Sequence, residues 1–328
     1  AVISVFEKEG IVDFAKALVK NDYRILSTGG TATLLKENGI DVVEVSDFTG
    51  QKEILNGRVK TLHPKVFGGI LGDLTNDEHK KQLEENEMEP ISLVCVNLYP
   101  FLETIKKTDD IREIIENIDI GGPSLIRAAA KNHTNVLVVT DPKDYVRVGT
   151  AIDEGAVDAE LNKNLAMKAF AYTAQYDVII HRYLFDTFDN EPFLDIYNTT
   201  FEKVDDLRYG ENPHQQAALY KPYIIHQTGI PNAKQLHGKQ LSYNNILDSD
   251  TALDIVKDFE KATATVIKHN NPSGVASAEN IADAYKKALA ADPKSAFGGV
   301  VALNKTVDKM TAELIKPVFT EVVIAPSF

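Results

Sequence analysis

The sequence has 328 residues, of which 44% are hydrophobic and 25% are charged, and its formal net charge is −13. The length suggests two domains, and the composition is that of an ordinary globular protein. The negative charge disfavours nonspecific binding to nucleic acid, and no apolar stretch approaches the roughly 18 residues of a membrane span. Cys95 is the only cysteine, which excludes an intramolecular disulfide.

The two ends of the sequence carry separate expectations. No signal peptide is recognisable at the start, so we expect a cytoplasmic protein that contacts no membrane. The chain opens directly on a strand-like segment without an initiator Met, and it stops abruptly after Phe328. We therefore expect a fragment, at least at the C-terminal end.

The first 140 residues alternate between strand and helix patterns. The apolar residues of Ile11–Leu18 recur at the spacing of a buried helix stripe. A short helix is expected between the turn Thr28–Thr31 and Gly39. Strands are expected at 1–5, 23–27, 41–45, 91–97 and 135–140. This order predicts an α/β domain with a mainly parallel sheet covered by helices.

The remainder of the chain predicts a second α/β domain. A helix is expected over about 155–185, and the periodicity is then lost in 186–201, where Asp, Asn and Pro gather. We place the domain boundary in that segment, with domains at 1–190 and 200–328. In the second domain, strands are expected at 262–267 and 300–303, and a helix at 281–291.

Two segments of the first domain have features of a phosphate site. Thr28-Gly29-Gly30-Thr31 lies between a strand and a helix, where glycines let backbone N–H groups approach an anion. Gly57–Lys65 holds Arg58, Lys60 and Lys65, cations that suit phosphate oxygens. Each segment has a simpler interpretation. The first could have glycines because a strand-to-helix turn needs them, and the second could be a solvated basic loop.

A third segment, Asp119–His133, combines a glycine pair with a cationic helix. Pro123 suits the first turn of a helix, and Ser124, Arg127 and Lys131 then fall on one face. That face could line a site, or its cations could simply match the negative end of the helix dipole. The segment Asn97–Pro100 adds polar groups at a strand end, where open α/β sheets usually bind ligands.

The second domain contains two polar segments of its own. Arg208–Gln215 surrounds Gly and Pro with functional groups, which indicates an ordered loop. The strand before Lys268 and His269 delivers both residues to a strand end, where they could transfer protons and stabilise charge, although such a pair is also common on surfaces. No His or Cys spacing is typical of zinc, and Ser273 lacks the pattern of a nucleophile elbow.

Seven stretches together resemble the AICAR transformylase/IMP cyclohydrolase family over essentially the whole chain. They are Gly57–Pro64, Asn97–Pro100, Asp119–Gly122, Ala128–His133, Ala174–Asp177, Arg208–Gln215 and Lys268–Gly274. The resemblance implies a methylglyoxal-synthase-like first domain and the first part of a cytidine-deaminase-like transformylase that works without a metal. It also implies the last two steps of IMP synthesis: formyl transfer from 10-formyltetrahydrofolate to AICAR, and dehydrative ring closure to IMP.

The resemblance also implies roles for individual residues and a homodimer. Nucleotide binding falls to Lys8, Thr28, Gly29, Gly30, Thr31, Arg58, Thr61 and Asn97 in the first domain, and to Arg208, Tyr209, Gly298 and Glu321 in the second. The groups implied in catalysis are Lys131 in proton transfer, Lys60 at the oxyanion, Tyr99 and Asp119 beside them, and Lys268 and His269 in formyl transfer.

The chain departs from the family pattern in its first loop. The family usually has Ser-Val-Ser-Asp-Lys-Thr-Gly there, whereas this chain has Phe6 in place of a hydroxyl and an added negative charge at Glu9. The transformylase of the family also continues beyond Phe328, so we expect this chain to be competent for ring closure only. The alternative is a nucleotide-sensing module without catalysis, joined to a dimerisation domain.

Overall fold

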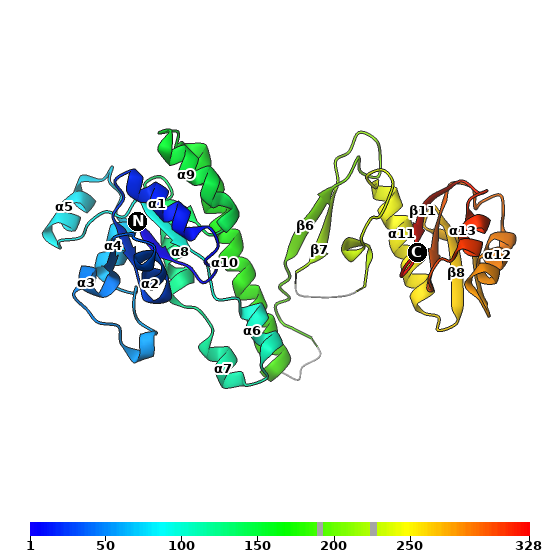
Figure 1. The fold of residues 1–328 in the computed structure, drawn as a ribbon, viewed down its shortest axis with the longest axis horizontal. Coiled ribbons are helices and arrows are strands. Elements are labelled where there is room, and N and C mark those ends of the chain that lie inside the picture. Colours follow the sequence, from blue (N-terminus) through cyan, green and yellow to red (C-terminus); the bar gives the residue numbers. More distant parts are fainter. Residues whose placement is uncertain (189–192, 224–227) are drawn as a thin grey trace. The chain divides into compact units, whose positions relative to one another are not determined.

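The computed structural model describes residues 1–188, 193–223 and 228–328. Contacts between Cα atoms divide the chain into two compact units, unit 1 (Ala1–Asn198) and unit 2 (Thr199–Phe328). Each unit has its own sheet and helices (Figure 1). The boundary segment expected at 186–201 includes residues 189–192, which lie outside the described residues.

Unit 1 is built on a parallel sheet with the strand order β3-β2-β1-β4-β5. Its central strand pairs in parallel on both sides, with Ile3 opposite Ser27 and Cys95. The strand and sheet predictions are confirmed, although the strands are shorter than expected. They are β1 (Val2–Ser4), β2 (Ile25–Ser27), β3 (Val42–Glu44), β4 (Leu93–Val96) and β5 (Leu137–Val139).

The helices of unit 1 cover this sheet. The expected stripe of the first helix is confirmed, because its apolar residues at 11, 14, 15 and 18 are all buried. The helices are α1 (Ile11–Lys20), α2 (Gly29–Glu37), α3 (Val45–Thr49), α4 (Pro64–Leu71), α5 (Asp77–Glu85), α6 (Phe101–Lys107), α7 (Ile111–Glu116), α8 (Gly121–Lys131), α9 (Tyr145–Asp153) and α10 (Ala159–Phe188), with short 3₁₀ turns at Leu55–Gly57 and Pro142–Asp144.

The long helix α10 begins later and ends later than the sequence suggests. It starts at Ala159 because Gly155 has a φ of +63° and the Asp158 side chain accepts the Leu161 N–H at 2.7 Å, as an N-cap does. Across the described ranges, neither α10 nor any other helix is both long and apolar enough to cross a membrane.

The strand order of unit 1 creates a switch point between β1 and β4. The chain moves outward from β1 through α1 and α2 in one direction, and from β4 through α8 in the other. Since such crossovers are right-handed, α8 lies on the opposite face from α1 and α2. Ligands of open α/β sheets bind outside the carboxyl ends of the strands at such a point. The fold therefore places the expected site where β1 and β4 end.

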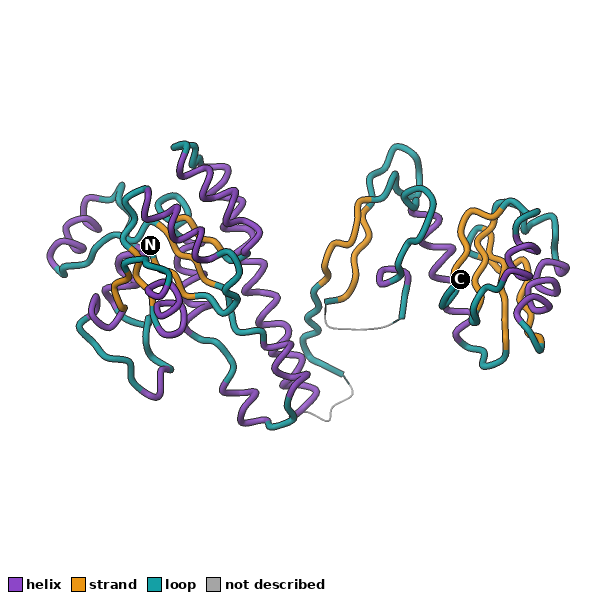
Figure 2. The backbone as a smooth tube through the Cα atoms, in the orientation of Figure 1, coloured by secondary structure: helices purple, strands orange, loops and turns teal. Residues whose placement is uncertain are grey.

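Unit 2 combines a two-stranded ribbon with a mixed four-stranded sheet of order β11-β10-β8-β9 (Figure 2). Its elements are β6 (Phe201–Asp206), β7 (Ala218–Pro222), a 3₁₀ turn at Ile230–Asn232, α11 (Tyr243–Lys257), β8 (Ala262–Lys268), β9 (Asn271–Ala278), α12 (Ile281–Ala291), β10 (Gly299–Leu303), α13 (Lys309–Ile315) and β11 (Thr320–Ile324). The expected strands and helix of this domain are confirmed.

The core of unit 2 lies on both faces of its larger sheet. Along β10, Val301 and Leu303 belong to the cluster under α12, whereas Val300 and Ala302 belong to the cluster under α11. Successive strand residues point to opposite faces, so α11 and α12 cover opposite sides.

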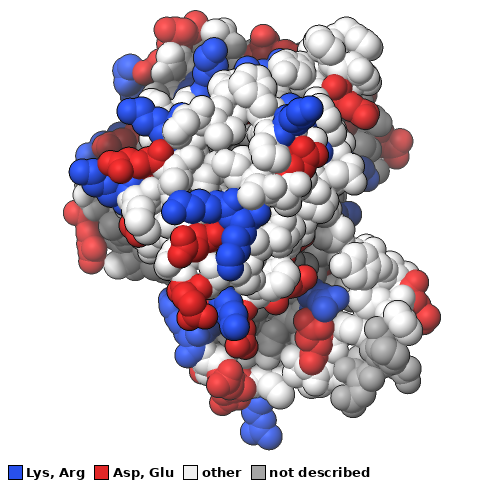
Figure 3. Space-filling view, turned by 90° about the vertical axis from the view of Figure 1, so that its right-hand side faces the viewer, with Lys and Arg blue, Asp and Glu red and all other residues white. Residues whose placement is uncertain are grey.

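On the face of the molecule shown in Figure 3, positively and negatively charged side chains are interspersed. The acidic side chains do not form one continuous patch on that face.

The segment after β8 is a tight hairpin turn. His269 and Asn270 both have positive φ, 51° and 61°, and the chain returns at once as β9. Pro272 is accommodated because β9 is an edge strand and the pairing register shifts beside it.

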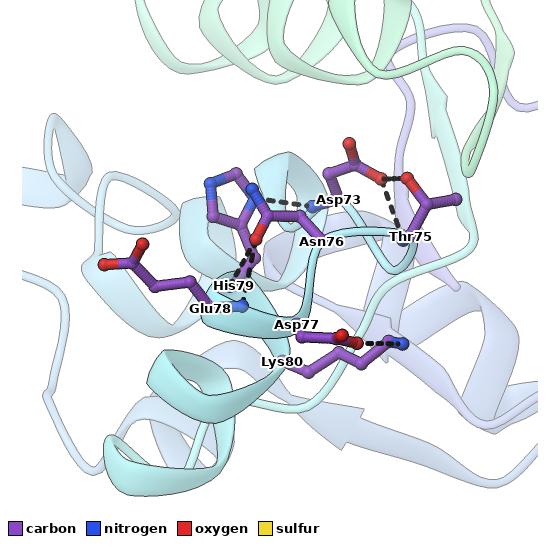
Figure 4. A network of polar contacts seen from close by, with 7 residues as sticks. All are labelled: Asp73, Thr75, Asn76, Asp77, Glu78, His79 and Lys80. Carbon is purple, nitrogen blue, oxygen red and sulfur yellow. Dashed lines mark hydrogen bonds and ion pairs between the residues drawn. The ribbon is translucent and has the colours of Figure 1, made fainter.

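A separate network fixes the start of α5 (Figure 4). The Asn76 side chain accepts the N–H groups of Glu78 and His79, and the Asp73 N–H donates to the His79 ring at 3.2 Å. Asp73 also accepts from the Thr75 N–H and hydroxyl, which hold the pKa of its carboxyl below the usual value. These contacts satisfy the first amides of a helix that buries only Leu83.

Candidate functional site

The loop after β1 packs directly against α2. The Thr31 hydroxyl accepts the Val5 N–H at 3.2 Å and lies 3.0 Å from the Val5 carbonyl oxygen. The Lys8 ammonium donates to the same hydroxyl at 2.6 Å and also to the Val5 carbonyl. Burial lowers the pKa of Lys8. This cation therefore lies at the switch point with no carboxylate among these contacts.

Asn97, directly after β4, fastens this loop to the centre of the sheet. Its side-chain oxygen accepts the N–H groups of Phe6 and Glu7 at 2.5 and 3.0 Å, and its amide donates to the Glu7 carbonyl at 3.2 Å. Asn97 is 7% exposed. It therefore works within this structure as a bridge across the switch point, and Tyr99 follows two residues later.

The N-terminus of α2 lies beside Lys60. Thr28 is extended and Gly29 has a φ of +56°, which opens the first turn of the helix. A Cβ on Gly29 would lie 3.9 Å from the Lys60 ammonium. Lys60 is also paired with Glu53 at 3.2 Å. A helix N-terminus and a lysine together favour an anion such as phosphate.

The start of α8 supplies the acidic side of the site. The Asp119 carboxylate accepts the Gly122 N–H at 2.8 Å, and a Cβ on Gly121 would lie only 3.2 Å from the Thr61 hydroxyl. Burial raises the pKa of Asp119, and the N–H groups of Gly121 and Gly122 partly oppose this. As expected, Pro123 lies in the first turn of the helix.

Two tyrosines of α10 support the site, and sequence reasoning gave them no role. The Tyr176 hydroxyl accepts the Asp119 N–H at 2.8 Å, and the Tyr172 hydroxyl accepts the Leu98 N–H at 3.0 Å. Burial raises the pKa of Tyr176 to about 12. The stretch Ala174–Asp177 was one of the seven shared motifs, so a signal existed, but only the fold shows that Tyr176 holds Asp119.

Arg58 and Lys131 are not gathered with the other predicted site residues. The Arg58 guanidinium forms an exposed ion pair with Glu116, with an Nε–Oε1 distance of 3.0 Å. Lys131 is the last residue of α8, about 15 Å along the helix axis from Gly121. The stripe of Arg127 and Lys131 lines a separate open hollow of about 570 Å³, whose apolar lining includes Phe67, Leu71 and Phe170.

In unit 2, a buried asparagine joins two predicted substrate residues. The Asn245 side-chain oxygen accepts from the Arg208 guanidinium at 3.3 Å, and its amide donates to the Glu321 carboxylate at 2.5 Å. Asn245 also completes a capping box with Ser242 at the start of α11. The Arg208 guanidinium lies over the Tyr209 ring, 5.5 Å from its centroid. Asn245 lies outside every motif that the sequence analysis used.

The other predicted residues of unit 2 lie at the same end of the sheet. The Lys268 ammonium donates to the Phe297 carbonyl, and a Cβ on Gly298 would lie 3.4 Å from that ammonium. Gly298 has a φ of +70°, and its N–H donates to Phe319 at 2.7 Å. His269 follows Lys268 in the hairpin turn. In the described part of the chain, no three His, Cys, Asp or Glu side chains form a metal-binding group.

Comparison with known proteins first defines the class and then the family. The sequence model of the MGS-like domain matches residues 10–124, in agreement with the parallel sheet of unit 1. The sequence model of the AICARFT/IMPCHase bienzyme matches residues 129–328, more than half of the chain. The chain therefore belongs to the AICARFT/IMPCHase bienzyme family.

Similar proteins cover the chain completely. It is 50% identical to a bifunctional purine biosynthesis protein PurH of Persephonella marina, 53% to that of Halalkalibacterium halodurans and 53% to that of Thermoanaerobacter sp.. These alignments include the whole of this chain. They span only 64%, 64% and 65% of the length of the relatives. The structure described as ForH covers 58% of this chain and 98% of its own, with 34% identity and a TM-score of 0.52.

Proposed function

We propose that unit 1 closes the ring of 5-formamidoimidazole-4-carboxamide ribonucleotide to give IMP and water. The observation that carries the proposal is the convergence of two helix N-termini, Lys8 and Lys60 with Tyr99 and Asp119 at one switch point. Cations and amides suit the phosphate, while an acid, a phenol and a lysine suit the reacting end.

The chemistry needs few groups because both reacting groups belong to one molecule. The carboxamide nitrogen attacks the formyl carbon, a C–N bond forms, and the former formyl oxygen leaves as water after protonation. Lys60 would stabilise the negative oxygen of the intermediate, and Tyr99 and Asp119 would orient or relay protons. Since proximity is already supplied, the protein adds mainly acid–base and electrostatic help.

Lys131 enters this proposal from a second copy of the chain. Its family role is proton transfer, but the axial separation of about 15 Å from the start of α8 exceeds the length of a lysine side chain. Its hollow carries apolar side chains, including Leu71 and Phe170, that are 40% and 41% exposed and suited to an interface. A cytoplasmic homodimer in which Lys131 serves the partner's site reconciles these features.

For unit 2 we propose the nucleotide side of formyl transfer from 10-formyltetrahydrofolate to AICAR. Arg208 and Tyr209 would bind the AICAR nucleotide. The side-chain amide of Asn245 links Arg208 to Glu321. His269 would take the amine proton, and Lys268, beside Gly298, would stabilise developing charge. No metal is part of this proposal.

The decisive experiment is to add the formamido nucleotide to the purified chain and follow IMP by chromatography. We expect turnover that falls roughly 10²-fold or more when Lys60 is replaced by alanine. A folded chain that binds the nucleotide without converting it would instead favour the non-catalytic nucleotide sensor.

A further inference from the structure

Two half-exposed aromatic rings meet at the switch point of unit 1. Phe6 and Tyr99 are 50% and 47% exposed, and their ring centroids are 5.5 Å apart at an interplanar angle of 67°. They come from segments more than 90 positions apart in the sequence. Edge-to-face pairs of this kind leave one ring face free to contact another planar group.

The rings are held in place by the backbone on either side. The Phe6 N–H donates to Asn97, which is buried, and Tyr99 follows Asn97 by two residues. The side chain of Phe6 therefore projects from an anchored loop next to the Lys8–Thr31 contact. Phe6 and Tyr99 both remain about half exposed at this end of the sheet.

We propose that Phe6 and Tyr99 form an aromatic wall that contacts the ring face of the nucleotide base and selects nucleotides over plain sugar phosphates. The proposal rests on the nucleotide function proposed above. The N-terminus of α2 and Lys8 would bind phosphate, a group that every sugar phosphate shares. Only a contact beyond the phosphate can distinguish the ligands, and an aromatic ring stacks on any planar base.

Phe6 is the informative member of the pair because Tyr99 is already assigned to the reaction. The related family usually has serine at this place, where a hydroxyl could contact phosphate. Phenylalanine cannot make that contact, so its contribution must be apolar. If Phe6 merely shaped the phosphate loop, its loss would weaken every phosphorylated ligand to the same degree.

The test compares IMP with ribose 5-phosphate, which lacks the base, by titration calorimetry of the whole chain. Phe6→Ser and Phe6→Leu should each weaken IMP binding about tenfold, because stacking on one base is lost. Ribose 5-phosphate should change less than about twofold. Phe6→Tyr keeps the ring and should bind IMP as the unchanged chain does. Phe188→Ser, which removes a 59% exposed ring at the end of α10, is the matched control.

Each outcome decides the question. Selective loss of IMP affinity in Phe6→Ser and Phe6→Leu, with Phe6→Tyr retained, supports the aromatic wall. An equal loss for both ligands, or no loss for either, overturns it while leaving the proposed function intact. Failure of the unchanged chain to bind IMP at all would overturn the proposed function and the aromatic wall together.

Discussion

At the scale of single residues, the candidate site depends on polar side chains that hold other residues in place. Asn97 binds two N–H groups of a loop some 90 positions away, and Tyr176 holds the backbone of Asp119. A buried polar group that is fully hydrogen-bonded specifies one arrangement, since breaking a partner leaves the other unsatisfied. The loop after β1 and the backbone of Asp119 are thereby fixed by contacts within the chain.

Lys60 gives the first prediction at this scale. Lys60→Ala should lower kcat for ring closure roughly 10²-fold or more, because one donor to the oxyanion is lost. Lys65→Ala is the control, since Lys65 belongs to the same basic segment but pairs only distantly, at 4.0 Å, with Glu87. Steady-state kinetics of both variants with the formamido nucleotide provide the measurement. Equal effects of the two substitutions would mean that the segment acts only by its overall charge.

Lys131 gives the second prediction. Lys131→Ala alone should lower kcat by roughly 10²-fold or more, because general acid–base help is lost. If Lys131 serves the site of a second copy, mixing this variant with an equal amount of Lys60→Ala should restore about a quarter of the activity of the unchanged chain, since half of the dimers then carry one intact site of two. Activity is measured after the mixed chains have exchanged subunits. No recovery from two inactive variants would place Lys60 and Lys131 in the same chain's site.

At the scale of elements, close backbone approach determines where helices can lie on the sheets. In unit 2, α12 packs so tightly on β9 that a Cβ on Gly274 would lie 1.9 Å from the Ala288 carbonyl oxygen. Neither backbone can yield without moving a whole element, because protein interiors are close-packed. Glycine is thus required by packing at this position and not by its own dihedral angles.

Gly274→Ala should therefore destabilise unit 2 by about 1–3 kcal/mol or more, as overpacking does. Gly229→Ala is a suitable control in the same unit, because its added Cβ would meet Pro231 at an ordinary 3.6 Å. Urea unfolding followed by circular dichroism compares the two. Equal midpoints for both variants would show that α12 can shift away from β9 at little cost.

At the scale of the whole molecule, acidic side chains that accept hydrogen bonds at turns make stability depend on pH. Contacts with nearby hydroxyl and backbone N–H groups lower the pKa values of Asp73, Asp292 and Asp308 below 3.8. A carboxyl with a lowered folded-state pKa contributes stability above its unfolded pKa, and loses it as the pH falls through the folded value.

These three carboxyl groups should therefore make the melting temperature fall as the pH drops below about 4. Replacing all three residues by asparagine keeps a hydrogen-bond acceptor at each turn but removes the titration, so the fall should become shallower. Thermal melts between pH 7 and pH 2 measure this. An unchanged acid slope in the triple variant would assign the acid sensitivity to other groups.

The sequence by itself determined most of the helices and strands, and it pointed to most residues of the candidate site. The stripe of Ile11–Leu18 and the positions of the strands follow from local sequence patterns, because burial on one face imposes a periodicity on neighbouring residues. The shared motifs likewise pointed to Lys60, Asn97 and Asp119. Such patterns are local, and each can be recognised without knowing what lies opposite.

Only the tertiary structure decided which of these residues meet. Helix length separates Lys131 from Asp119 although their motifs are neighbours in the chain, and the switch point joins Phe6 to Asn97 although they are distant. Asn245 lies outside the shared motifs, and its two partners, Arg208 and Glu321, are 37 and 76 positions away in the chain. The distance between two residues in a fold depends on how helices and strands pack against each other. A motif or a periodic pattern within one segment does not contain that information.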